Sequence, residues 1–253
     1  MKNLNQLILL LLKDIIRDRF FLTAAAAAVL LLAAALPLSE MTVGDPGKTT
    51  ISLSLSLLNL FALFVVMVPG VQSLSAQVND KLLLFILARP LTRAQHLAAA
   101  AAAVLCTVTC GLLLISLCAY LLTLLQGPVS PLLFLSAVWL TLLEALLLVC
   151  FAALFCVITT PTLASFLTLF VYVIGHGAEQ ALMIMAQSDS FWRFPATFLG
   201  PLLPNLEFLN VKSLLVNNLP LPPSFFLHSF LYTASYAALV FWLASRAVKK
   251  SAA

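Results

Sequence analysis

The chain has 253 residues and a formal net charge of +4, with 63% hydrophobic and only 9% charged residues. Soluble domains carry roughly 25% charged residues, so this composition excludes a soluble globular protein. Because apolar runs long enough to cross a bilayer recur from end to end, the sequence predicts an all-α integral membrane protein without a separate soluble domain.

The first 19 residues have apolar side chains at helical spacing, interrupted by charged residues between Lys13 and Asp18. Their apolar core is too short for a secretory signal peptide, and no small-residue cleavage site follows it. We predict an amphipathic helix over residues 1–19 that lies at the cytoplasmic membrane surface. An extension of the first membrane span is the alternative.

Charges and helix breakers divide the rest of the chain into six predicted membrane spans, each needing about 20 apolar residues. As one helix, the uncharged stretch between Arg93 and Glu144 would reach about 75 Å, more than twice the hydrocarbon thickness, so it must turn back near Gly127 and Pro128. The breakers around Pro161 end the next span. The predicted spans are residues 20–39, 51–71, 97–125, 131–158, 162–186 and 224–246.

The positive charges predict the orientation of these spans. Ten of the thirteen Lys and Arg residues fall in the amino-terminal segment, the loop after the second span and the tail, whereas Lys48, Arg193 and Lys212 fall on the other side. By the positive-inside rule, both termini are predicted to be cytoplasmic, in the cell inner membrane. We interpret these charges as topology and lipid contacts, and we expect no nucleic-acid partner.

Two patterns are superficially similar to chemical sites. The first is the run Gly47, Lys48 and Thr49, which matches the last three positions of a phosphate-binding loop. The glycine that this motif requires five residues earlier is replaced by Thr42, and a preceding strand is missing. Five cysteines lie inside predicted spans without the close C-x-x-C spacing of metal or redox sites, and we interpret them as packing residues. The sequence therefore predicts no catalytic, cofactor or metal site in this chain.

Three ionisable residues lie inside predicted spans. An ionised Glu144 facing lipid would cost several kcal/mol, so we expect it to face protein or water. It is either part of a translocation path or proton relay, or a polar contact between helices. His176 and Glu179 lie on one face of the fifth span, either as a stabilising pair or as part of a site. Gly175 and Gly177 flank His176 and would let another backbone approach closely.

The predicted cytoplasmic loop over residues 76–93 is the most informative stretch. Val78, Leu82, Phe85 and Ile86 have helical spacing, and Pro90 ends the pattern. This predicts a short amphipathic helix at the cytoplasmic surface. Its apolar face would contact either a partner protein or the lipid interface.

Two motifs carry a family resemblance. After Asp80 the chain reads LLLFILARPLTR, and between the last two predicted spans it reads LLPNLEFLNVK. Together with the six-span layout, these motifs resemble the membrane subunits of type-2 ATP-binding-cassette (ABC) exporters, the family of the permease for nitrous-oxide reductase maturation. A Gly-Lys pair that often follows the first motif is replaced here by the alanines after Arg93.

The resemblance implies a permease that works as a homodimer, or as a heterodimer with a close relative, and binds two copies of a separate cytosolic ATPase. ATP and Mg²⁺ would then be bound by the partner, and the permease itself would not be an enzyme. The residues that the family uses for contact with the ATPase correspond here to a coupling helix and its flanks: Asp80, Lys81, Leu82, Phe85, Arg89, Pro90 and Arg93.

The resemblance also implies that the insertion over residues 187–223 caps the translocation path from outside, with Pro204, Asn205 and Glu207 in the family motif. Its six prolines forbid one continuous helix, so short half-inserted helices are expected, forming either a structural lid or a substrate-binding one. Two other functions are considered: an ion-coupled carrier or channel using Glu144, His176 and Glu179, and a passive membrane scaffold.

Overall fold

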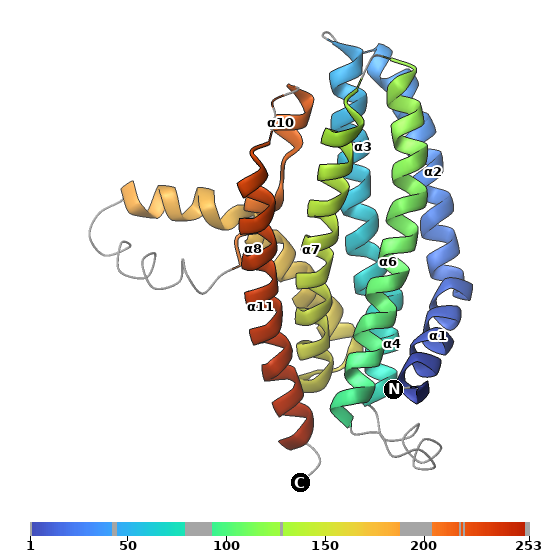
Figure 1. The fold of residues 1–253 in the computed structure, drawn as a ribbon, viewed down its shortest axis with the longest axis vertical. Coiled ribbons are helices and arrows are strands. Elements are labelled where there is room, and N and C mark those ends of the chain that lie inside the picture. Colours follow the sequence, from blue (N-terminus) through green and yellow to red (C-terminus); the bar gives the residue numbers. More distant parts are fainter. Residues whose placement is uncertain are drawn as a thin grey trace.

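The computed structural model describes residues 2–41, 45–78, 93–126, 129–187, 204–217, 219 and 221–250, and within them the side chains of 2–5, 178–187 and 249–250 are not described. Every regular element in this part of the chain is helical (Figure 1), which confirms the all-α class. Five of these helices are long and apolar enough to cross a membrane. They are α2 (Arg19–Glu40), the continuous helix Pro46–Val78, α6 (Arg93–Leu124), α7 (Pro131–Ile158) and most of α11 (Pro223–Lys250).

The amino-terminal segment forms a helix of its own, α1 (Lys2–Arg17), and not an extension of the first span. Asp18 has extended backbone angles, and its carboxylate accepts a hydrogen bond of 3.0 Å from the Phe20 amide, which caps α2. Leu11 and Ile15 are buried where α1 packs against α6, whereas Leu9 and Leu10 are exposed. A helix with buried apolar side chains is therefore present in the segment predicted to be amphipathic.

The helix Pro46–Val78 has three parts: α3 (Pro46–Val65), a π-helical turn η1 (Val66–Gly70) and α4 (Val71–Val78). Pro69 lies inside the π turn and lacks the amide hydrogen that a regular helix needs. The Ser165 hydroxyl, from another helix, donates to the Met67 carbonyl at 2.7 Å. Neighbouring side chains of this kind are what allows a membrane helix to contain proline.

The start of α3 explains the pattern that is similar to a phosphate-binding loop. Asp45 accepts a hydrogen bond of 3.0 Å from the Gly47 amide and caps the helix, and Pro46 occupies its first turn. Lys48 therefore belongs to the beginning of a long apolar helix rather than to a loop between a strand and a helix.

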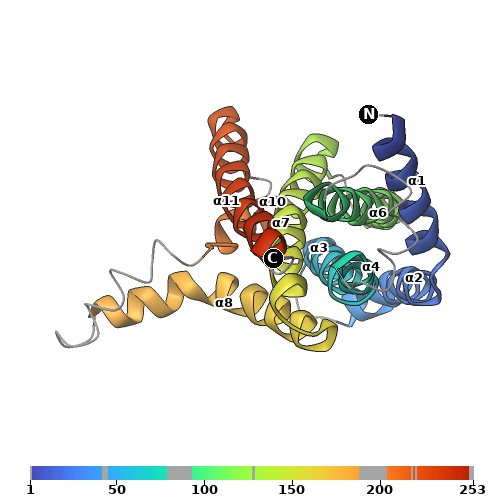
Figure 2. The ribbon, with the colours of Figure 1, turned by 90° about the horizontal axis from the view of Figure 1, so that it is seen from below.

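Helix α7 is the centre of the bundle. It packs against α3, α4, α6, α11 and α8 (Pro161–Gln187), and the view along the bundle places it between them (Figure 2). Within the most apolar part of α7, 61% of the residues are buried inside the protein, against 22% for α2 and α11. The same residues, 131–158, were expected as the fourth span.

Helix α8 covers the residues predicted as the fifth span, 162–186, but its course differs from that of the other long helices. It starts beside the lower end of α7, and its last turns lie across the direction of the other long helices and project away from them (Figures 1 and 2). Its described side chains end at residue 177, and the apolar part found within them is Pro161–Gly177. The chain then returns to the upper part of the bundle at α10 (Lys212–Val216), and α11 descends to the end where both termini lie.

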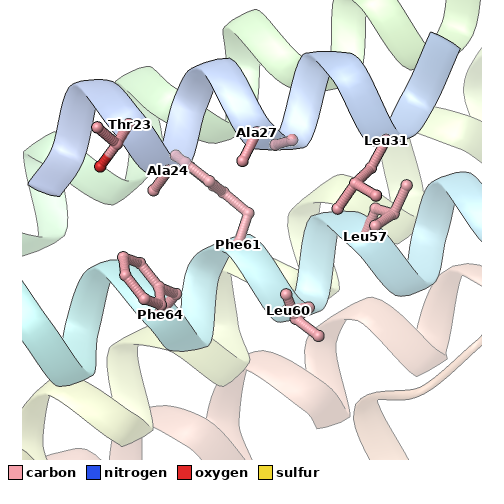
Figure 3. Close-up of a pocket in the computed structure, with 9 residues that line it drawn as sticks. Thr23, Ala24, Ala27, Leu31, Leu57, Leu60, Phe61 and Phe64 are labelled. Carbon is pink, nitrogen blue, oxygen red and sulfur yellow. The ribbon is translucent and has the colours of Figure 1, made fainter. Parts of the chain in front are cut away.

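The outward face between α2 and α3 is a groove of about 280 Å³ with almost entirely apolar walls (Figure 3). Its single hydroxyl, from Thr23, donates to the Phe20 carbonyl at 3.1 Å. This surface suits contact with hydrocarbon and supports a membrane location. The groove is lined by Thr23, Ala24, Ala27, Ala28, Leu31, Leu57, Leu60, Phe61 and Phe64.

At the upper end, one amide joins three helices. The Gln126 side chain, just beyond α6, accepts a hydrogen bond of 2.6 Å from the Thr50 hydroxyl of α3 and donates one of 2.8 Å to Ser39 of α2. Ser39 and Thr50 are both almost completely buried. This amide fixes the helix ends without any charged group.

We expect Thr50→Val to lower the free energy of unfolding by about 1 kcal/mol, because the half-buried side-chain oxygen of Gln126 loses a donor while the shape of residue 50 is kept. Thr107→Val is the matched control, since the buried Thr107 hydroxyl donates only to Ala103 of its own helix. Thermal unfolding in detergent measures both. Equal losses in the two variants would contradict the structural importance of the Gln126 contact.

Candidate functional site

Glu144 lies near the middle of α7, the most buried of the candidate membrane spans. Only 4% of its surface is exposed. It faces protein, as expected. Its Oε1 atom has no hydrogen-bond partner among the described residues. A buried carboxyl with an unsatisfied oxygen is expensive inside a membrane, so the groups around it determine what it can do.

The nearest ionisable group is His176 of α8. Its Nε2 atom is 3.6 Å from Glu144 Oε1, and its Nδ1 atom is 3.2 Å from the Tyr172 carbonyl oxygen. A hydrogen on Nδ1 satisfies that carbonyl and leaves Nε2 facing the carboxyl group. The two groups can therefore hold one proton between α7 and α8. Glu179, the third predicted member, lies in α8 with its side chain outside the described part.

The segment Pro204–Val216 packs against this pair from the side. Leu206 is completely buried, and its amide donates to the Gly175 carbonyl at 3.0 Å, one residue before His176. The Asn205 amide donates to the Tyr232 hydroxyl of α11 at 2.7 Å. The segment predicted as an external cap thus packs between α7, α8 and α11 in its described part, and Pro204 is buried there.

Two charges of this segment act on the central carboxyl group. Glu207, in the short 3₁₀ turn η2 (Glu207–Leu209), and Lys212, at the start of α10, both interact electrostatically with Glu144. Asn210 links the two residues: its side-chain amide donates to Glu207 Oε1 at 3.0 Å, and its side-chain oxygen accepts from the backbone amide of Lys212 at 3.3 Å. The Glu207 carboxylate and the start of α10 are therefore tied together beside a buried acid.

A second polar contact continues this layer toward α3. The Thr141 hydroxyl donates to the Asn59 side chain at 2.8 Å, and both residues are buried. With Asn210 and Lys212 they border a cavity of about 10 Å³, which is about the size of one water molecule. We call the set Asn59, Thr141, Glu144, His176, Glu207, Asn210 and Lys212 the central polar layer.

Sequence reasoning identified Glu144, His176 and Glu207 but assigned Glu207 to an external cap. It missed Asn59, Thr141 and Lys212. Thr141 precedes Glu144 by three residues and so shares its helix face, and Asn59 is the only amide side chain between Ile51 and Val71. Both signals were present in the sequence. The contribution of Lys212 depends on a fold-back that no local pattern predicts.

The two glycines of α8 have different environments. A Cβ atom at Gly175 would lie 2.6 Å from Leu206 Cγ and 3.0 Å from the Pro204 carbonyl oxygen, so the close approach predicted there exists. At Gly177 no atom of the described residues is found within 4 Å, so the close approach predicted there is not seen in this part of the chain.

Most of the predicted ATPase contacts fall outside the described residues. Arg93 is the exception: it is the first residue of α6, and it interacts with other residues of the protein. Val78, the last described residue before this stretch, ends α4. The contacts that the structure does not describe are Asp80, Lys81, Leu82, Phe85, Arg89 and Pro90.

Among the residues whose side chains are described, no group of three or more His, Cys, Asp or Glu side chains could hold a metal ion. Neither a protein-family model nor a curated protein sequence matches this chain. A functional proposal must therefore rest on the chain's own residues.

We expect Gly175→Ala to destabilise the protein by about 1–3 kcal/mol, because the added methyl group must displace Leu206 and the backbone at Pro204. Gly177→Ala should be neutral or stabilising, since alanine favours a helix and the space is open. Thermal unfolding of both variants is the measurement. If the two alanines had the same effect, the packing of Pro204–Val216 on α8 would be wrong.

Proposed function

We propose that the chain is the membrane-spanning subunit of an ATP-driven ABC transporter of the exporter type, located in the inner membrane with both termini cytoplasmic. It forms the translocation path as a dimer, and α8 with Pro204–Val216 completes a sixth crossing. Two copies of a separate cytosolic ATPase bind ATP and Mg²⁺ and drive it through the segment 76–93.

The observation that carries this proposal is the continuous helix Pro46–Val78. Its 33 residues reach about 50 Å, well beyond the roughly 30 Å of the hydrocarbon core. It leads directly into the segment 79–92, at the end of the bundle where both termini lie (Figure 1). The charged and apolar pattern of that segment would therefore be available to a cytosolic partner.

The contacts of this helix suggest how force would enter the bundle. A push on α4 would act at the π turn around Pro69, where the helix is locally weakened. Ser165 connects that turn to α8 through its bond to Met67. Helix α8 in turn holds His176 against Glu144, so a movement at the cytoplasmic end would reach the central polar layer.

Replacing Asp80 and Phe85 together by alanine should weaken association with the ATPase about tenfold or more, because few residues usually dominate such an interface. Binding of the purified ATPase to the chain in nanodiscs and the rate of ATP hydrolysis are the measurements. The matched control is the double replacement of Leu38 and Glu40 by alanine. These two exposed residues lie at the carboxyl-terminal end of α2, away from the end of the bundle that precedes segment 79–92. Unchanged binding and hydrolysis in the Asp80 and Phe85 variant would refute the coupling role.

A second function, an ion-coupled carrier or channel, is favoured by the buried Glu144 and His176 pair. Membrane-buried ionisable residues commonly belong to proton relays. The ATP-driven account assigns the pair to the contact between α7 and α8 instead. The two accounts differ in whether the chain alone moves protons.

Proteoliposomes containing the chain alone and an internal pH-sensitive dye separate these accounts when a membrane potential is imposed. We expect no proton flux above empty liposomes, because the energy for transport comes from the partner. Flux that depends on the chain and disappears in Glu144→Gln, but not in the surface control Glu40→Gln, would instead establish the carrier.

A further inference from the structure

The surroundings of Glu144 differ between the two ends of the bundle. Toward the upper end, the segment Pro204–Val216 brings Glu207 and Lys212 into electrostatic contact with Glu144, and both residues are partly exposed (Figure 1). The small cavity of the central polar layer, about 10 Å³, lies between this segment, α3 and α7. A polar cavity of this size suits one water molecule. This side of the buried carboxyl group is therefore polar.

Toward the end where both termini lie, the protein around α7 is apolar. The helix continues for about 21 Å beyond Glu144, and Leu147 and Leu148 in its next turn are almost completely buried. Along α8, the buried Thr168 hydroxyl donates to the Ala164 carbonyl of its own helix at 2.8 Å. A proton moving in this direction would have to cross tightly packed hydrocarbon.

The ionisable groups that interact with Glu144 come from α8 and from the segment beside it. Helix α8 contributes His176 and Tyr172, and the segment contributes Glu207 and Lys212. Of these, only a histidine ordinarily changes its charge near neutral pH. The ionisable side chains described on the other helices packed against α7 are, cysteines apart, Lys48, Arg93, His96, Tyr120, His228, Tyr232, Tyr236 and Arg246.

We propose that Glu144 and His176 exchange their proton only with the compartment at the upper end of the bundle, through the small cavity and the polar groups of Pro204–Val216. Water in the cavity can pass a proton to the pair from that side, whereas the apolar half of α7 closes the other. With both termini cytoplasmic, the pair responds to the external pH. A proton carrier needs access from both sides, so this inference also separates the pair from a carrier. It holds whether or not an ATPase drives the chain.

Infrared difference spectroscopy of the full chain in liposomes tests the sidedness. It follows the carbonyl stretch of protonated carboxyl groups, and the Glu144 band is the one that Glu144→Gln removes. In liposomes that protect a carboxyl-terminal tag from protease, the upper end faces outward. We expect the band to grow when the external buffer is acidified and to stay constant when the internal buffer is acidified. A band that follows the internal pH, both pH values or neither would overturn the proposal.

The route through the cavity has its own test. Thr141→Val removes a hydroxyl from the cavity wall and keeps the shape of the side chain. We expect the band to respond to an external pH step about tenfold more slowly, because a water in the cavity loses a hydrogen-bonding partner. Thr107→Val, which removes a buried hydroxyl bonded only within α6, is the matched control. Equal response rates in the two variants would contradict this route. Because the assay contains no ATPase, its failure would leave the ATP-driven function to be judged separately.

Discussion

The hydrocarbon core of a bilayer contains no water to satisfy polar groups, so each backbone donor and acceptor of a membrane span needs a partner within the protein. That constraint explains the positions where the helices depart from regular geometry. Asp18 caps α2 where α1 ends, Ser165 donates to the carbonyl of Met67 at the π turn, and the Gly175 carbonyl accepts from Leu206. Each irregular backbone position is accompanied by a specific polar contact.

Helix α8 connects two of these positions. Ser165 and His176 are eleven residues apart, or about 16 Å along a helix, so one rigid element contacts both the π turn and the central carboxyl group. The proposed ATP-driven mechanism would use this connection to carry a movement of α4 inward. The carrier mechanism would use the same contact to move a proton. The geometry is common to both, and the energy source distinguishes them.

Local patterns in the sequence predicted much of the fold, because charges and helix breakers mark most helix ends, although Pro69 and Glu144 lie inside helices. The α7 residues were predicted from this signal alone. The path of α8 and the burial of Pro204–Val216 were not predictable, since both depend on contacts between distant segments. Gly175 and Gly177 illustrate the limit: they are equivalent in the sequence, but only Gly175 lies against Leu206. Lys212 was assigned to the outer side from its position between the last two predicted spans, and its interaction with Glu144 depends on a fold-back that this position does not predict.

The central claim is that this chain is a gate driven by a separate motor. Its most direct test is the mass and composition of the intact assembly isolated from native membranes, determined by native mass spectrometry. The account predicts two copies of this chain, or one copy with a close relative, together with two copies of a cytosolic ATPase. An assembly that contains this chain and no ATPase, yet transports its cargo in liposomes without ATP, would contradict it.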